Sequence, residues 1–210
     1  MTRLPIDERR RQIVQAALAV ATRDGLENVT MRAVAAEAQV SLGVLHYCFT
    51  DKAEMMRAVA AHDHEDGLAT ALAVGGDREP AQLIASLVET YLAEVVADRR
   101  RQLFGYELTV ASLRDPELAG IAAAQRASKL AHARAFLPVL AERAGLTWSV
   151  PVEDVARMLV REIDGAVLVW LVDGDTGALA QALHETGRRL LAAARPATEA
   201  ATATPVPSSV

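Results

Sequence analysis

The sequence predicts an all-α protein with a small N-terminal helical head and a larger C-terminal helical bundle. Apolar side chains recur at the three-to-four-residue spacing of amphipathic helices along almost the whole chain of 210 residues. Aromatic residues make up only 4% of the chain, and alanine, leucine, arginine and glutamate are frequent, which favours helices over sheets. A chain of this length can bury a sizeable core without disulfides or structural metals.

Composition also narrows the class of protein. Cys48 is the only cysteine, so an internal disulfide and a cysteine-only metal site are excluded, and a reducing, cytoplasmic location is expected. We expect no secretory signal and no membrane contact, because no uncharged apolar run approaches the ~20 residues of a membrane span. The net charge is −5, yet residues 1–60 carry +1 and the remainder −6. The head can therefore approach a polyanion more easily than the body can.

Helix-capping residues place the elements of the head. Gly25 ends the first helix, Thr30 and Ser41 are N-caps of two short helices, and Asp51 with Glu54 has the spacing of a capping box. The expected helices cover about 10–23, 31–38, 41–49 and 51–73. The second and third are too short to be stable alone, so their neighbours must hold them.

The Gly- and Pro-containing loop 75–80 separates the head from the body. In the body, periodicity predicts helices at about 80–97, 100–114, 116–143, 152–172 and 177–195. We therefore expect a head at 1–60, a helical body at 61–195 and a disordered tail at 196–210, where proline, alanine, threonine and serine accumulate.

The third helix has two distinct faces. Spacing predicts that one set of side chains packs inward, namely Val44, Leu45, Cys48 and Phe49. The other set is expected to face outward, namely Leu42, Gly43, His46 and Tyr47. A short helix that follows a tight turn and presents Gly, His and Tyr is typical of a helix-turn-helix, whose second helix enters the major groove of DNA.

The head closely resembles the DNA-binding domain of the TetR (tetracycline-repressor) family of transcriptional regulators. The resemblance runs without a gap over residues 10–59 and is carried by "RDGLENVTMRAVAAEAQVSLGVLHYCFTDK" within it. In the body, "RDPEL" and "IDGAVLVWLVDGD" resemble stretches of the family's ligand-binding and dimerisation domains. The chain departs from the family pattern at Gln39, where glycine is usual, and at His46-Tyr47-Cys48-Phe49.

This resemblance implies a homodimeric repressor that leaves a palindromic operator in double-stranded DNA when a small-molecule effector binds the body. Thr30 and Arg32 would contact phosphates, and Tyr47 and Lys52 would hold the DNA backbone. The residues facing base edges would be Ser41, Leu42, Gly43 and His46.

Effector and dimer contacts are expected in the body. The candidate effector-binding residues are aromatic or polar side chains within apolar helices: Tyr91, Phe104, Tyr106, Glu107, His132, Phe136, Arg161 and Trp170. The candidate dimer seam is formed by apolar stripes on the last two helices: Val155, Leu159, Ile163, Val167, Leu179, Leu183 and Leu190.

Other readings stay open at this stage. A helical enzyme or small-molecule carrier without DNA binding is one, although no catalytic or cofactor-binding motif is present and we expect neither an enzyme nor a cofactor. An activator, or a redox or metal sensor on the same fold, is another. Cys48 is expected to be a buried hydrophobe and His62–Asp66 a solvated acidic face. Arg9–Arg11 either reach DNA or simply begin the first helix.

Overall fold

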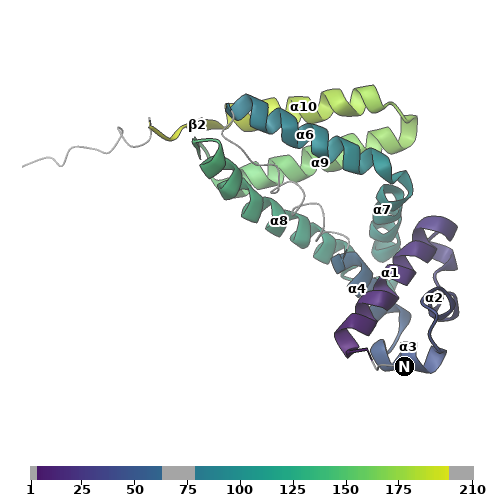
Figure 1. The fold of residues 1–210 in the computed structure, drawn as a ribbon. Helices are drawn as coiled ribbons and strands as arrows, with labels where there is room; N and C mark the ends of the chain where they lie inside the picture. Colours follow the sequence, from purple (N-terminus) through teal and green to yellow (C-terminus); the bar gives the residue numbers. More distant parts are fainter. Residues whose placement is uncertain (1–3, 63–78, 199–210) are drawn as a thin grey trace, which may run out of the picture. The chain divides into compact units, whose positions relative to one another are not determined.

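The computed structural model describes residues 4–62 and 79–198, which form two compact units (Figure 1). Unit 1 consists of the described residues within Met1–Asp66 and Asp98–Ser128, and unit 2 of those within Gly67–Ala97 and Lys129–Val210. The described part is helical apart from one pair of short strands, which confirms the predicted all-α class. Within it, no helix is both long and apolar enough to cross a membrane.

Unit 1 starts with the helical head. Its elements are α1 (Ile6–Asp24), the 3₁₀ turn η1 (Leu26–Asn28), α2 (Met31–Glu37), α3 (Leu42–Cys48) and α4 (Lys52–His62). The long α1 packs against α2, α3 and α4, so it supplies the support that the two short helices require. Gly25 ends α1, as predicted, but its φ of 92° and ψ of 158° are not those of a left-handed helical cap; glycine adopts this conformation readily.

A later segment completes the core of unit 1. It comprises α7 (Arg99–Arg114), the 3₁₀ turn η2 (Pro116–Leu118) and the start of α8 (Ile121–Arg143). Phe104, Leu108 and Ile121 from this segment are buried in one cluster with Ile13 and Leu45 of the head. The apolar core around the predicted head thus extends beyond residue 60 into residues 98–128.

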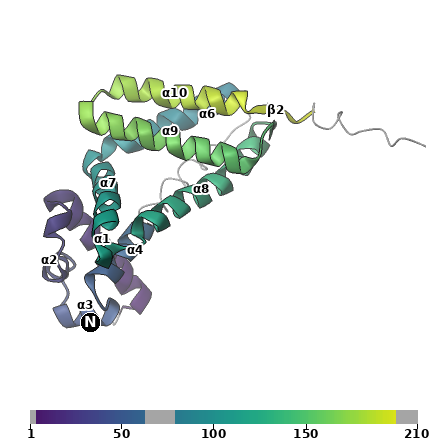
Figure 2. The same cartoon turned by 180° about the vertical axis from the view of Figure 1, so that it is seen from behind.

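Unit 2 is a helical layer that carries a small strand pair. It contains α6 (Pro80–Ala97), α8 from Lys129 onward, β1 (Leu146–Trp148), α9 (Val152–Asp173), α10 (Thr176–Ala192) and β2 (Ala194–Pro196). Figures 1 and 2 show α10 beside both α6 and α9, and these are the closely packed pairs of the unit. Leu83, Leu137, Ala156 and Leu190 lie in its buried core.

Two predicted helix boundaries in the body are wrong. The helix expected at 116–143 begins at Ile121, because η2 and Gly120, with a φ of 87°, precede it. The helix expected to reach residue 195 ends at Ala192, and β2 follows and pairs antiparallel with β1. Pro196 therefore belongs to a strand; residues 199–210 of the predicted tail lie outside the described residues.

Candidate nucleic-acid interface

A tight turn sets the direction of α3. Gln39 N–H donates to the Ala36 carbonyl at 3.1 Å and Val40 N–H donates to the Ala35 carbonyl at 2.9 Å, the paired bonds that close many helix C-termini. Gln39 has a φ of 54°, the left-handed conformation that glycine adopts most easily. The turn therefore places glutamine in the left-handed conformation. Ser41 then caps α3, and its hydroxyl accepts from Val44 N–H at 3.2 Å.

The inward face of α3 is narrow and is centred on Leu45. Cys48 and Phe49 are buried beside Leu45, as predicted, and lie within roughly 60° of it around the helix axis at about 100° per residue. Leu42 lies at about 60° from Leu45, on the same side as Phe49, and its side chain is half-buried against the same core. Leu42 was expected to face base edges, but only part of its side chain is available on the surface.

The outward face includes one residue that was expected to point inward. Val44 is 37% exposed, because it lies about 100° from Leu45, at the same angle as His46 on the opposite flank. Gly43 and Tyr47 point away from the core, and the Tyr47 side chain is 71% exposed. We call Gly43, Val44, His46 and Tyr47 the α3 strip. Angles measured from the buried centre, rather than pairwise spacing, would have placed Val44 correctly.

Gly43 has no structural reason within the chain to be glycine. Its φ is not in the left-handed range, and a Cβ built on it would meet nothing closer than Ser41 Oγ at 3.9 Å. Glycine destabilises a helix by roughly 0.5–1 kcal/mol relative to alanine. Packing within the described residues therefore does not account for glycine at this position.

Three of the residues predicted to contact the DNA backbone lie at the N-termini of α2 and α4. Thr30 is exposed and caps α2, with its Oγ1 accepting from Ala33 N–H at 3.1 Å. Arg32 is exposed on the first turn of α2, and Lys52 is half-exposed at the first position of α4. Ser41 is exposed at the cap of α3. The structure therefore presents these side chains to solvent on one unit.

An ion-pair clamp fixes the end of α3. The Arg10 guanidinium donates to the Cys48 carbonyl, pairs with Glu54 at 3.0 Å and lies 4.1 Å from the centre of the Phe49 ring. Glu54 also accepts from the backbone N–H and the hydroxyl of Thr50, at 2.9 and 2.8 Å. These bonds from Thr50, together with Arg10, lower the pKa of Glu54 to about 2. Arg10 is therefore a structural residue.

The capping box predicted at the start of α4 has a different second bond. Asp51 Oδ1 accepts from Glu54 N–H at 2.7 Å, as a cap should. The Glu54 carboxylate returns to Thr50, one residue before the expected partner.

The alternative sites in the head gain no support. Cys48 is 3% exposed, and burial raises the pKa of its thiol, which makes the reactive thiolate scarcer. Within the described residues, no group of three His, Cys, Asp or Glu side chains could hold a metal ion. Residues 63–66 of the acidic run lie outside those residues.

The predicted effector-binding residues are divided between the units. Phe104, Tyr106 and Glu107 lie on α7 in unit 1, and the Phe104 side chain is buried in the core of that unit. The others lie in unit 2: Tyr91 on α6, His132 and Phe136 on α8, and Arg161 and Trp170 on α9. His132 and Phe136 share one face of α8 because they are four residues apart.

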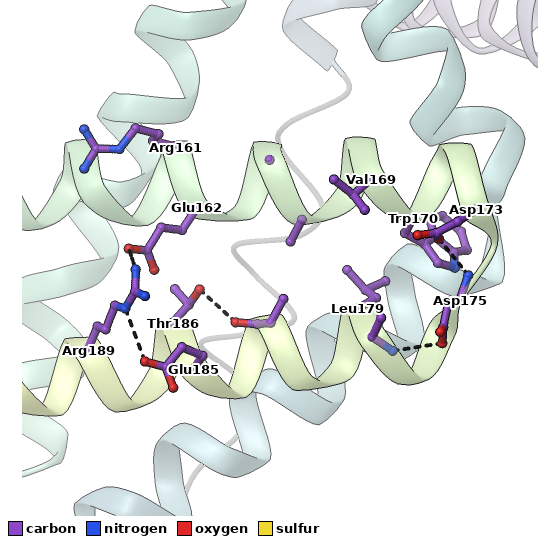
Figure 3. Close-up of a pocket in the computed structure, with 14 residues that line it drawn as sticks. Arg161, Glu162, Val169, Trp170, Asp173, Asp175, Leu179, Glu185, Thr186 and Arg189 are labelled. Atoms are coloured by element: carbon purple, nitrogen blue, oxygen red, sulfur yellow. Dashed lines mark hydrogen bonds and ion pairs between the residues drawn. The ribbon is translucent and has the colours of Figure 1, made fainter.

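Arg161 and Trp170 belong to an open groove of about 450 Å³ along α9 and α10 (Figure 3). Trp170 is buried, and its indole N–H donates to the Thr176 hydroxyl at 3.2 Å, which ties the end of α9 to the start of α10. In Figure 3 Arg161 points away from α10, whereas Glu162 points across to Arg189, its ion-pair partner at 2.7 Å. The two predicted pocket residues therefore do not meet in one enclosed cavity.

The predicted seam residues lie mostly inside unit 2 rather than on an outer face. Leu159 and Ile163 are half-buried. The remaining five are buried in their own chain: Val155, Val167, Leu179, Leu183 and Leu190. The apolar stripes correctly marked the packing of α9 and α10, but they pack against α6, α8 and each other. A side chain buried in its own subunit has no surface left for a partner.

Comparison with known proteins shows which family the chain matches. Residues 13–59 match the family described as bacterial regulatory proteins, tetR family, and residues 75–193 match a tetracyclin repressor-like C-terminal domain. The second match alone spans more than half of the chain. The chain belongs to the TetR family.

Relatives of this TetR-family protein agree with the assignment. It is 30% identical over 172 residues to the nicotine-responsive transcriptional repressor HdnoR of Paenarthrobacter nicotinovorans. The matched region covers 81% of this chain and 88% of that relative. The repressor KstR of Rhodococcus jostii is 41% identical over 58 residues, only 28% of this chain and 27% of KstR. The predicted class, a ligand-responsive DNA-binding transcriptional repressor, is confirmed.

Solved structures show the same fold. The multidrug binding protein EbrR in complex with ethidium is 30% identical with a TM-score of 0.62, over 87% of this chain and 98% of EbrR. A TetR transcription regulator from Haloarcula marismortui is 18% identical with a TM-score of 0.70, over 90% of this chain and all of that one.

Proposed function

We propose that this TetR-family protein acts as a homodimer whose two α3 helices enter successive major grooves of a palindromic operator, and that an effector bound in unit 2 releases it. Two symmetric reading helices require half-sites one helical turn, ~34–36 Å, or a multiple of it apart. An effector that changes their separation favours the state that no longer matches the DNA.

The α3 strip is the observation that carries this proposal. It exposes four residues, two on each side of the buried Leu45, on a helix of only seven residues, and its glycine leaves the backbone open to close approach. The rest of unit 1 buries the opposite face of the helix and clamps its end through Arg10 and Glu54. A rigid, exposed helix face is what direct reading of base edges needs.

The strip suggests a division of roles. His46 carries ring nitrogens that can hydrogen-bond base edges, and Val44 offers methyl groups that suit contact with a thymine methyl. Ser41 and the exposed part of Leu42 face base edges at the start of the helix. Thr30, Arg32, Tyr47 and Lys52 hold the sugar-phosphate backbone and contribute affinity rather than specificity.

Sequencing the genomic fragments retained by the purified full chain tests the proposal. We expect enrichment of an inverted repeat whose half-site centres are one turn or a multiple apart. Uniform recovery of fragments would overturn operator binding, and catalytic turnover without DNA retention would favour a helical enzyme or carrier.

Variants separate the roles on the enriched duplex. His46→Ala and Val44→Ala should relax preference at particular base pairs by about 1–3 kcal/mol each, whereas Lys52→Gln should weaken all duplexes alike. Arg126→Gln removes an exposed charge from α8 and is the matched control. A uniform loss of affinity in His46→Ala would contradict its reading role.

Unit 2 is proposed to bind the effector near Tyr91, His132 and Phe136. The names of the relatives suggest the first compounds to try: nicotine, to which HdnoR responds, and ethidium, with which EbrR was crystallised. Apolar cavities with a few convergent polar groups are the usual sites for such molecules in helical bundles.

Intrinsic fluorescence reports on this unit directly, because both tryptophans, Trp148 and Trp170, lie in unit 2. Nicotine should change tryptophan emission and lower operator affinity. Ethidium binds duplex DNA itself, so its binding should be measured without DNA. His132→Ala should weaken the effector response and leave effector-free operator affinity unchanged; an unaltered response would remove His132 from the site.

A further inference from the structure

The turn between α2 and α3 holds Gln39 in a backbone conformation that suits glycine better. Among the described residues, Gln39 is the one non-glycine residue with a positive φ. Hydrogen bonds fix the backbone on both sides of it. The N–H groups of Gln39 and Val40 donate to carbonyls of α2, and the Gln12 amide of α1 donates to the carbonyl of Ala38 at 2.8 Å. The surrounding structure therefore imposes the left-handed conformation on whichever residue occupies this position.

Nothing within the described part of the chain explains a glutamine at this position. The Gln39 side chain is exposed, and its amide forms no hydrogen bond to any other described residue. A Cβ in the left-handed conformation crowds the following carbonyl oxygen, so glutamine is less stable here than glycine would be. Backbone strain of this kind is concentrated at functional sites. The amide is available to bind a group outside the chain.

The course of the chain brings this amide close to the start of α3. Two residues span at most about 7 Å, so the Cα atom of Gln39 lies within that distance of the Cα atom of Ser41. Val40 between them packs partly against the core of the head, whereas Gln39 and Ser41 are both exposed. Two polar side chains therefore precede the α3 strip on the solvent side of the turn.

The acidic side chain nearest to Gln39 in the sequence is already paired. Glu37 at the end of α2 forms an ion pair with Arg23 of α1 at 2.9 Å, so its negative charge is compensated within the chain. The Gln39 amide supplies two N–H donors without adding charge. Glutamine side chains are among those that donate to phosphate oxygens in protein–DNA complexes.

We infer that Gln39 donates from its side-chain amide to a phosphate oxygen of the operator, at the wall of the groove that α3 enters. This inference rests on the proposed function and adds one contact to it. Ser41, at the cap of α3, is proposed to face base edges, and Gln39 lies before that cap, outside the reading helix. Its contact adds affinity for any duplex and carries no sequence preference.

Replacing Gln39 by glycine separates the strain from the contact. The melting temperature of Gln39→Gly should equal or exceed that of the wild type, because glycine adopts a positive φ freely. Its affinity for the duplex enriched from genomic fragments should fall about fivefold, the value of one net hydrogen bond. Fluorescence anisotropy should show the same fall on a duplex of equal length with scrambled half-sites. Unchanged affinity, or a loss confined to the enriched duplex, would overturn the phosphate contact.

Charged substitutions at Gln39 report directly on a nearby phosphate. Gln39→Lys should steepen the plot of log affinity against log salt concentration by about 1, because a lysine beside a phosphate releases one more counterion. Gln39→Glu should weaken binding to both duplexes, since its carboxylate repels the phosphate. Ala123→Lys and Ala123→Glu are the matched controls, at an exposed position of α8 in unit 1, and should leave the slope unchanged. Equal slopes for the two lysine variants would contradict the contact.

These measurements distinguish failure of the inference from failure of the proposed function. A wild-type chain that retains no DNA would overturn both. A wild-type chain that binds the inverted repeat, together with a Gln39→Gly variant of equal affinity, would overturn only the contact made by Gln39.

Discussion

At the scale of single residues, glycine is absent where the backbone would favour it and present where the backbone does not require it. The two positions are Gln39 in the turn before α3 and Gly43 in the first turn of α3. Gln39 adopts a left-handed conformation that glycine would adopt more easily, whereas Gly43 sits in ordinary helical backbone with free space where a Cβ would be. The left-handed conformation of Gln39 costs about 1–2 kcal/mol, which the rest of the fold offsets. At Gly43, packing within the described residues would also accept a residue with a Cβ.

Gly43→Ala should therefore affect stability and DNA binding in opposite directions. Thermal unfolding should show a gain of about 0.5–1 kcal/mol, because alanine is the better helix former. Fluorescence anisotropy should show roughly tenfold weaker operator binding, because the added methyl overpacks a close interface. Gly105→Ala in α7, where a Cβ also meets nothing within 4 Å, should stabilise the protein without weakening DNA binding.

Glu54 makes stability depend on acid pH. Its pKa is lowered from 4.5 to about 2 by Thr50 and Arg10, so the native state favours the ionised carboxylate. That contribution is fully present above pH 4.5 and is lost as the pH falls from 4.5 to 2. The gap in melting temperature between wild type and Glu54→Gln should be constant from pH 7 to 5 and close below 4.5. A gap that persists unchanged at pH 2.5 would contradict the clamp.

At the scale of elements, close approach of two helices holds unit 2 together. Gly187 of α10 is buried, and a Cβ on it would lie 2.8 Å from Ile84 Cγ2 of α6. The glycine therefore sets how closely α10 packs against α6, and Thr186 beside it turns its hydroxyl back to the Ala182 carbonyl at 3.1 Å.

Gly187→Ala should destabilise unit 2 by about 1–3 kcal/mol, because the extra methyl forces the helices apart. Urea unfolding followed by tryptophan emission measures this loss of stability, because both tryptophans lie in unit 2. Adding Ile84→Ala removes the clashing methyl. The double variant should therefore lose less unfolding free energy than the summed losses of the two single variants. Strict additivity would show that the two side chains are not coupled.

At the scale of the whole molecule, the protein is acidic and would be repelled by DNA. It must therefore bind DNA through a region whose own net charge is neutral or positive. The net charge is −5, yet residues 1–60 carry +1, and Arg32 and Lys52 are among the solvent-accessible basic side chains of this part. Binding should then depend on a few phosphate contacts and weaken with salt.

A plot of log affinity against log salt concentration should be linear with a negative slope. Arg32→Gln and Lys52→Gln should each reduce the magnitude of the slope by about 1, since each variant loses one phosphate contact. A flat plot for the wild type would mean that the exposed basic residues do not contact phosphates.

Local signals in the sequence were sufficient for the helices and the class of fold. Apolar periodicity, the caps Thr30, Ser41 and Asp51, and the resemblance across residues 10–59 determined the helix order of the head and the family. Such features depend on residues within one or two turns of each other, so they can be read along the chain.

Tertiary packing alone decided which sides of those helices remain exposed. Phe104 became core because α7 packs against α1, Val44 became exposed because only a narrow face of α3 meets the core, and Leu179 was buried by neighbouring helices. The strands β1 and β2 pair Thr147 with Arg195, a contact between residues far apart in sequence. A period in the sequence shows that a helix has an apolar side, but what covers that side depends on contacts between distant segments.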